Sequence, residues 1–173
     1  MNDFNKILEQ YDIKFIDKQT VTIEDLHEMK KQGISTETFL SFFGKKYDYL
    51  FHGSRNDISF GEQIKSKTGV IFASDKPAIA ILKAIFLNNA KNLGYPLNLL
   101  EDNSNLILVI DEPQKDTMGE QGYVYIISNK EGFKKDSTSN WQYYKEIKGG
   151  DGVSFIKKIE IEKSDFKYSV EIK

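Results

Sequence analysis

The chain has 173 residues, a length at which one domain can bury roughly two thirds of its unfolded surface in a single core. Its 39% hydrophobic and 29% charged residues are typical of a globular protein and exclude disordered and fibrous classes. With no Cys and only two His, the chain has no disulfide framework, no thiolate nucleophile and no cysteine or three-histidine zinc site. We therefore expect a single domain that uses no metal.

Charge and hydropathy limit the partners of the protein. The 24 basic and 26 acidic residues give a net charge of −2, which argues against a nucleic-acid-binding role. The N-terminus lacks a basic start followed by an apolar core, and no window reaches the about 18 apolar residues that a membrane span needs. These features predict a cytoplasmic protein with no membrane partner.

The first 46 residues are predicted to form a helical N-terminal extension. Thr22 and Asp25 have the spacing of a capping box, which marks the start of a helix. Apolar residues with helical spacing flank this signal on both sides. Three helices are expected: one near residues 4–8, one over 23–31, and one from 35 or 36 to 44.

Residues 47–173 are predicted to form a β-rich core. One long helix should follow the second strand, beginning after Ser74 or Asp75 and ending at Gly94. The polar segment 129–152 is expected to be a long loop. Because few helices separate the strands, the fold class is α+β, with two small mixed or antiparallel sheets that form a ligand cleft. Strands are expected over residues 49–52, 70–73, 106–110, 123–128, 155–162 and 168–172.

The first candidate site lies where the strand beginning at Tyr49 ends in His52, Gly53 and Ser54. A glycine allows a ligand to approach the backbone, and a histidine and a hydroxyl both offer hydrogen bonds. The alternative is a histidine whose ring bonds a carbonyl group at the end of a strand.

Arg55 follows Ser54 directly and is the only arginine in the chain. Its planar, bidentate donor suits a phosphate or a carboxylate better than lysine does.

A second segment, Gly69 to Ser74, is by itself a buried strand that enters a helix. Taken together, a strand ending in His-Gly-Ser and a later strand of the form Gly-Val-x-Phe-Ala-Ser resemble the ADP-ribosyltransferase fold. Gly122 to Ile127, followed by Phe133 and Asp136, is similar to part of the small rifampin-type ADP-ribosyltransferases. The segment Asn140 to Glu146 resembles the one in which many relatives place their catalytic acid. The resemblance covers about residues 47–165.

The resemblance implies an enzyme that transfers ADP-ribose from NAD to an acceptor, such as a protein, and releases nicotinamide. It assigns a ribose hydroxyl to His52, the nicotinamide amide to the backbone at Gly53, and ring stacking to Phe72. Asp136 and Glu146 are the candidate catalytic acids, because a carboxylate stabilises positive charge on the ribose as the bond to nicotinamide breaks. Each could instead be a solvated loop carboxylate. The implied nucleotide-binding residues are His52, Gly53, Ser54, Arg55, Phe72 and Ser74.

The chain departs from the family pattern at two positions. A tyrosine expected near the second strand is missing, and Asn140 stands where a glutamate often precedes the aromatic residue. A non-catalytic module that binds NAD, ADP-ribose or a related nucleotide is therefore a second hypothesis. A third is a protein-interaction domain whose partner surface consists of the N-terminal helices and the many aromatic residues.

Overall fold

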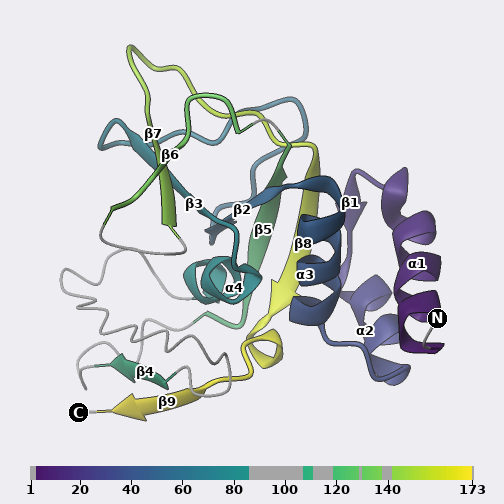
Figure 1. Ribbon diagram of the computed structural model, residues 1–173. Helices are drawn as coiled ribbons and strands as arrows, with labels where there is room; N and C mark the ends of the chain where they lie inside the picture. Colours follow the sequence, from purple (N-terminus) through teal and green to yellow (C-terminus); the bar gives the residue numbers. More distant parts are fainter. Residues whose placement is uncertain (1–2, 86–106, 111–118, 129, 138–141, 173) are drawn as a thin grey trace.

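The computed structural model describes residues 3–85, 107–110, 119–128, 130–137 and 142–172. Within them the fold is α+β, as predicted (Figure 1). The helices are α1 (Asp3–Ile16), α2 (Ile23–Lys31), α3 (Thr36–Tyr47), α4 (Pro77–Ile85) and the short 3-10 helix η3 (Lys163–Asp165). The strands are β1 (Thr20–Val21), β2 (Leu50–Ser54), β3 (Val70–Ser74), β4 (Ile107–Ile110), β5 (Gln121–Ile127), β6 (Lys134–Lys135), β7 (Gln142–Glu146), β8 (Lys157–Glu162) and β9 (Ser169–Ile172).

Seven strands form one mixed sheet in the order β1-β8-β5-β2-β3-β7-β6, and β4 pairs with β9 in a separate parallel ribbon. The predicted pair of small sheets is therefore replaced by one larger sheet, because hydrogen bonding continues from β2 to β3. That connection is narrow, since Phe51 opposite Ser74 is the only register pair between the two strands. Beyond it β3, β6 and β7 turn away from β2, β5 and β8 (Figure 1).

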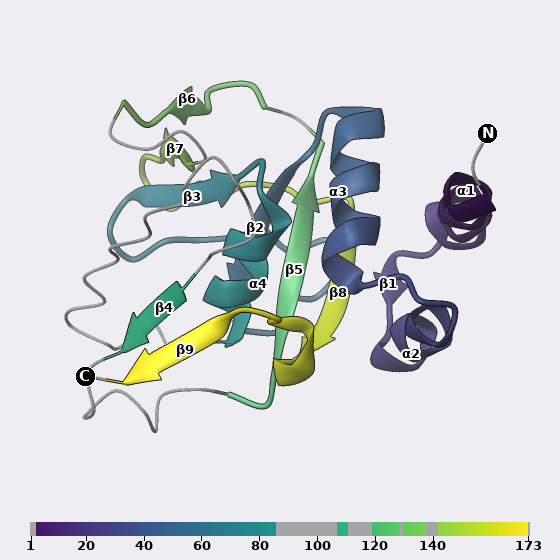
Figure 2. The same ribbon diagram turned by 60° about the horizontal axis from the view of Figure 1, so that its bottom comes forward.

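The larger core lies on one face of β2, β5 and β8, where α3 and α4 pack side by side (Figure 2). Residues of the N-terminal helices, such as Phe15, Leu26 and Phe39, belong to the same core as Val124 and Ile159 of the sheet. Strand β1 also extends the sheet by pairing with β8. The N-terminal 46 residues are helical as predicted, apart from β1, and they share the core of the β-rich part.

Two glycines let α4 approach the sheet very closely. A Cβ atom on Gly53 of β2 would lie 1.9 Å from the Ala80 carbonyl oxygen, and one on Gly122 of β5 would lie 2.0 Å from the Ala84 carbonyl oxygen. Any side chain at these positions would force the helix away from the sheet. The small residues on both surfaces therefore set the position of α4.

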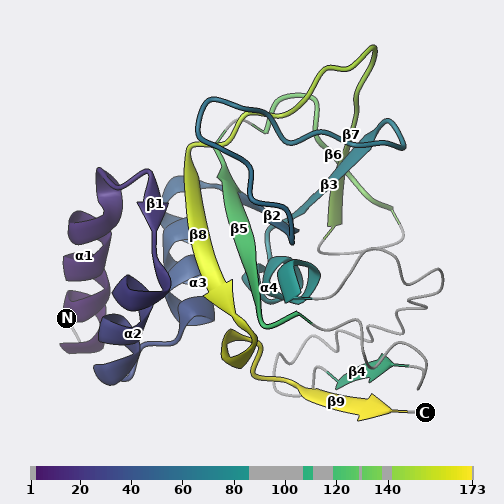
Figure 3. The same cartoon turned by 180° about the vertical axis from the view of Figure 1, so that it is seen from behind.

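The opposite face of the sheet has a smaller core around Leu50, Ile71 and Tyr125. Connecting segments rather than helices cover it: the segment before β3 and the segment before β8 pass over this side (Figure 3). The two segments are joined by a β-bridge between Ile64 and Val153. The two faces of the sheet therefore differ, one being covered by helices and the other by loops.

Most of the predicted elements are present, with specific differences. The capping box of Thr22 and Asp25 is confirmed at the start of α2. Helix α3 continues past Gly44 to Tyr47, because this glycine allows a close contact with the Phe51 ring and does not end the helix.

The prediction of a long loop over 129–152 was wrong, since β6 and β7 lie within it. The predicted part of the long helix beyond Ile85 lies outside the described residues. None of the described helices has the length and apolarity of a membrane span.

Candidate functional site

His52 lies at the point where β2 and β3 separate. Its Nδ1 is 2.7 Å from the carbonyl oxygen of Phe72, so the side chain bridges the two strands next to their single register pair. A carbonyl oxygen only accepts, so Nδ1 carries the proton. Burial lowers the pKa of His52, which favours the neutral ring. In that form Nε2 is a hydrogen-bond acceptor.

Tyr125 supports the histidine from the neighbouring strand β5, where it stands opposite His52. The two ring centroids are 6.4 Å apart, and Tyr125 is fully buried. Its hydroxyl donates to the carbonyl of Asn56 and accepts from the backbone N–H of Ile58, at 2.7 and 2.8 Å. These bonds hold the segment that follows β2 in place, so the surroundings of His52 are well ordered by buried contacts.

Phe72 and Lys83 form a pair on the side of the sheet that carries α4. Phe72 is an exposed aromatic residue, with 39% of its surface accessible. The Nζ atom of Lys83, from α4, lies 5.3 Å from the centroid of its ring, within the range of a cation–π contact. Lys83 is half-buried, and this burial lowers its pKa to about 8. The charge of Lys83 further lowers the pKa of His52.

Gln142 links Lys83 to one of the two predicted acids. Its Nε2 donates to Asp136 Oδ2 at 3.0 Å, and its Oε1 lies 3.4 Å from Lys83 Nζ. The orientation of the amide is determined by these partners, because a carboxylate only accepts and an ammonium only donates. Backbone pairing reinforces the contact, since the Asp136 N–H donates to the Gln142 carbonyl at 2.8 Å. We call the five residues His52, Phe72, Lys83, Asp136 and Gln142 the junction cluster.

Glu146, the other predicted acid, lies at the far end of β7. It stands opposite Val70, whereas Gln142 stands opposite Ser74 next to the junction. Four residues of extended strand separate the two ends of β7 by about 13 Å. Glu146 is exposed and lies outside the junction cluster. The structure thus connects Asp136 to the junction through Gln142 and leaves Glu146 outside it.

The other predicted nucleotide-binding residues have structural contacts of their own. The α4 side of Gly53 is filled by the Ala80 carbonyl. Both serines accept hydrogen bonds from backbone N–H groups two residues later, Ser54 from Asn56 and Ser74 from Lys76. The Arg55 guanidinium donates to the Ile85 carbonyl at 3.2 Å. These contacts account for the four residues without a ligand, and their predicted roles toward NAD stay predictions.

Sequence reasoning missed Lys83 and Gln142. Lys83 is the only charged residue of α4, whose other eight residues are all buried. A single lysine in a wholly apolar helix is a signal that could have identified it, because a charge is costly to bury. Gln142 has no such signal, and its segment was assigned to a loop.

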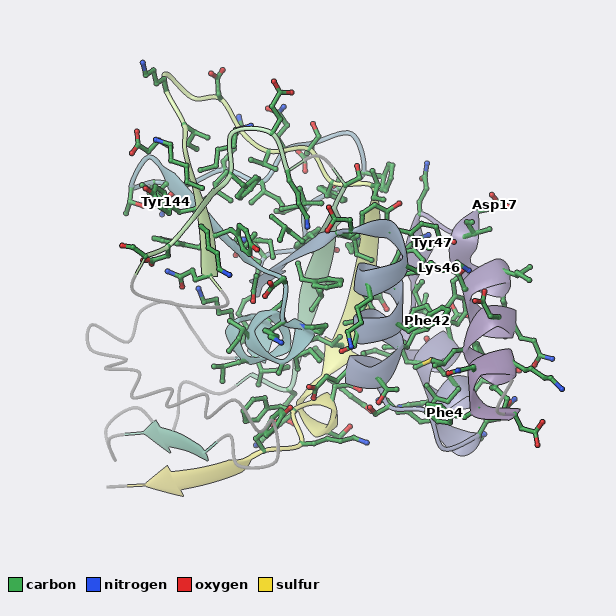
Figure 4. All side chains as sticks on the ribbon, in the orientation of Figure 1. Phe4, Asp17, Phe42, Lys46, Tyr47 and Tyr144 are labelled. Carbon is green, nitrogen blue, oxygen red and sulfur yellow. The ribbon has the colours of Figure 1, made fainter. Side chains whose placement is uncertain are left out.

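A separate pocket of about 300 Å³ is lined by none of the residues predicted to bind or act on NAD. It opens where α1 and α3 end, and Figure 4 shows Asp17 and Tyr47 at this place. The ammonium group of Lys157, which lines the pocket, already donates to the carbonyls of Phe15 and Ile16. The residues lining it are Ile16, Asp17, Lys18, Gln19, Phe43, Tyr47, Tyr49, Phe60, Ile156 and Lys157. We favour the junction cluster as the candidate site, because the ammonium group of Lys83 has only one long polar contact, to Gln142, among the described residues.

Within the described part of the chain, no three His, Asp or Glu side chains gather as they would around a metal ion. No protein-family model, curated protein or solved structure matches the chain. The junction cluster therefore has to be interpreted from its own chemistry. It combines a neutral histidine, an exposed aromatic ring, a half-buried cation and a carboxylate held by an amide.

Proposed function

We propose that the chain is an NAD-dependent ADP-ribosyltransferase-like protein, which binds NAD at the junction cluster, transfers ADP-ribose to an acceptor and releases nicotinamide. The observation that carries the proposal is the position of His52. It bridges two separating strands through Nδ1, and its neutral ring keeps Nε2 as an acceptor for a ribose hydroxyl. The two halves of the sheet on either side of this histidine would form the walls of the nucleotide site.

The neighbours of His52 suit the remaining parts of the reaction. The exposed ring of Phe72 offers a stacking surface for the nicotinamide. When the bond between ribose C1′ and the nicotinamide nitrogen breaks, its electron pair leaves with nicotinamide and positive charge develops on the ribose. The carboxylate of Asp136 would stabilise that charge. The acceptor then forms the new bond to C1′ and gives up its proton.

Two measurements test the proposal: calorimetric titration with NAD and an assay for nicotinamide release. We expect His52→Ala to abolish release, because the ribose loses its hydrogen-bond acceptor. His27→Ala is the matched control, since this second histidine is exposed and bonds Glu162 at 2.9 Å on the other side of the molecule. Absence of binding at millimolar NAD would overturn the proposal.

Paired substitutions identify the acid. We expect Asp136→Asn to lower nicotinamide release by at least about a hundredfold, the usual cost of losing a group that stabilises charge in a transition state. Glu146→Gln should leave the rate unchanged, because Glu146 lies at the far end of β7. The reverse result would assign the chemistry to Glu146 and require β7 to move.

A second candidate is a non-catalytic module that binds NAD or ADP-ribose. It is favoured by the bond from Gln142 to Asp136, which already uses one oxygen of the carboxylate. This candidate predicts nucleotide binding without nicotinamide release, and affinity that Asp136→Asn leaves unchanged. Arg55→Lys adds a further test. The substitution weakens nucleotide binding if Arg55 contacts the pyrophosphate, and it leaves binding intact if the guanidinium only donates to the Ile85 carbonyl.

A further inference from the structure

We propose that Lys83 binds the anionic group of the ligand, which in the proposed function is the pyrophosphate of NAD, and that Gln142 holds the ammonium group in position for it. The identity of the ligand rests on the proposed function, whereas the anion-binding role rests on the contacts of Lys83 itself.

Within the part of the chain that the structure describes, Lys83 is a half-buried cation without a matching anion. Among the described residues no carboxylate lies within 4.0 Å of its ammonium group, and its polar contact is the neutral Gln142 oxygen at 3.4 Å. Phe72 lies against it at 5.3 Å. An ammonium group has three donors, and one long bond leaves most of this capacity unused. An incoming anion would supply the missing partner.

Two other half-buried lysines have such partners. Lys30 lies 2.6 Å from Asp165 and 3.0 Å from Glu162, and Lys158 lies 2.6 Å from Asp57. Compared with these, Lys83 bears the cost of burial without the compensation of an ion pair. A residue that destabilises the free protein in this way is typical of a binding or catalytic site.

The arrangement of charges in the junction cluster also indicates which charged group a ligand needs. Gln142 stands between the cation of Lys83 and the carboxylate of Asp136, and bonds both. The cluster therefore has a positive end and a negative end, separated by one amide side chain. A ligand whose anionic group reaches the positive end would supply the partner that Lys83 lacks among the described residues, and the pyrophosphate of NAD is such a group.

The experiment uses inorganic pyrophosphate as the probe and measures its affinity by NMR titration at low salt and pH 7. We expect Lys83→Met, which keeps most of the side-chain volume, to weaken binding by about tenfold or more, because a charge-assisted hydrogen bond is lost. Lys83→Arg should retain part of the affinity. Lys76→Met is the matched control, since Lys76 is exposed and precedes the same helix. Equal affinity for the wild type and Lys83→Met would overturn the inference.

A second readout separates binding from a merely structural role. Lys83→Met should raise the melting temperature at pH 7, because an uncompensated charge is removed from a half-buried position. Bound pyrophosphate should raise the pKa of Lys83 above the value of about 8 that it has in the protein without ligand. A melting temperature that falls, together with unchanged pyrophosphate affinity, would show that Lys83 only supports the fold.

The results also distinguish this inference from the proposed function. If pyrophosphate binds in a Lys83-dependent manner but NAD does not bind, the anion site stands and the proposed function fails. If NAD binds and releases nicotinamide with equal efficiency in Lys83→Met, the proposed function stands and the role of Lys83 is disproved.

Discussion

Two lysines, one in each half of the molecule, show how differently the protein treats buried charge. Lys157 lies beneath the N-terminal helices with only 4% of its surface exposed, and its ammonium group donates to the carbonyls of Phe15, Ile16 and Lys18 at the end of α1. Lys83 at the strand junction has one long bond to an amide. Burial lowers the pKa of both, so their partners make the difference.

The carboxylates of the two regions differ in the same way. Asp165, which is 1% exposed, is paired with Lys30 and accepts a hydrogen bond from Thr36. Asp136 is held by the neutral Gln142 instead. In the helical half, each of these buried charged groups is paired with an opposite charge or bonded to carbonyl groups at a helix end. Such pairing is expected of groups that stabilise a fold. At the junction no carboxylate of the described residues pairs with Lys83, which leaves its ammonium group available to a ligand.

The largest effect should come from disturbing the close packing of α4 on the sheet. Gly53→Ala would place a Cβ atom 1.9 Å from the Ala80 carbonyl oxygen, so α4 would have to move away from β2. We expect a loss of about 3 kcal/mol in the free energy of unfolding, measured by denaturant titration. Gly61→Ala, which has open space but a positive φ of +94°, should cost only about 1 kcal/mol. Equal losses would mean that the helix contact adjusts without strain.

Lys157→Met tests the helical half directly. It leaves the carbonyl groups at the end of α1 buried without a donor, so we expect a loss of about 2 kcal/mol in the free energy of unfolding. Amide hydrogen exchange should show faster opening of the last turn of α1. If Lys157→Met left the free energy of unfolding unchanged or raised it, Lys157 would not stabilise the fold and would not differ from Lys83 in this respect.

Lys83→Met should have the opposite sign. The folded-state pKa of about 8 lies below the unfolded value of 10.5, so the cost of burying the charge is complete below pH 8. The wild type should gain stability as the pH rises from 8 to 10.5. We expect the variant to be more stable by about 1–2 kcal/mol at pH 7 and to lose this advantage by pH 10.5. Denaturant titration at the two pH values gives the test, and a lower stability of the variant at pH 7 would contradict it.

Glu162→Gln should give the smallest effect and should show it only in acid. Hydrogen bonds from Ser164 and His27, with support from Lys30, lower the pKa of Glu162 to about 2. Its stabilising contribution is present above the usual pKa of 4.5 and is lost as the pH falls toward 2. We expect the variant to be less stable by about 1 kcal/mol at pH 7. The stabilities of variant and wild type should converge near pH 2, and parallel stability curves from pH 7 to 2 would rule out this contribution.

Much of the fold could be predicted because its signals are local. The capping box of Thr22 and Asp25 lies within four residues, and alternating or periodic apolar patterns identified α3, β2 and β8. Strand β7 escaped prediction because its Tyr-rich sequence lies between polar, glycine-bearing segments. Its burial depends on pairing with β3, which a local pattern does not contain.

The candidate site could be predicted only in part. The sequence by itself indicated His52 as a ligand-edge residue and Asp136 as one of two acids, because residue type and neighbours carry those signals. Only the tertiary structure separated Asp136 from Glu146 and brought in Lys83, whose contact with Gln142 spans 59 residues. Local chemistry determines which residue types a segment offers, whereas strand order and the close packing of α4 on glycines decide which of them meet. Contacts between residues that are distant in the sequence form only when the sheet and the helix pack into one core, so a local sequence pattern does not reveal them.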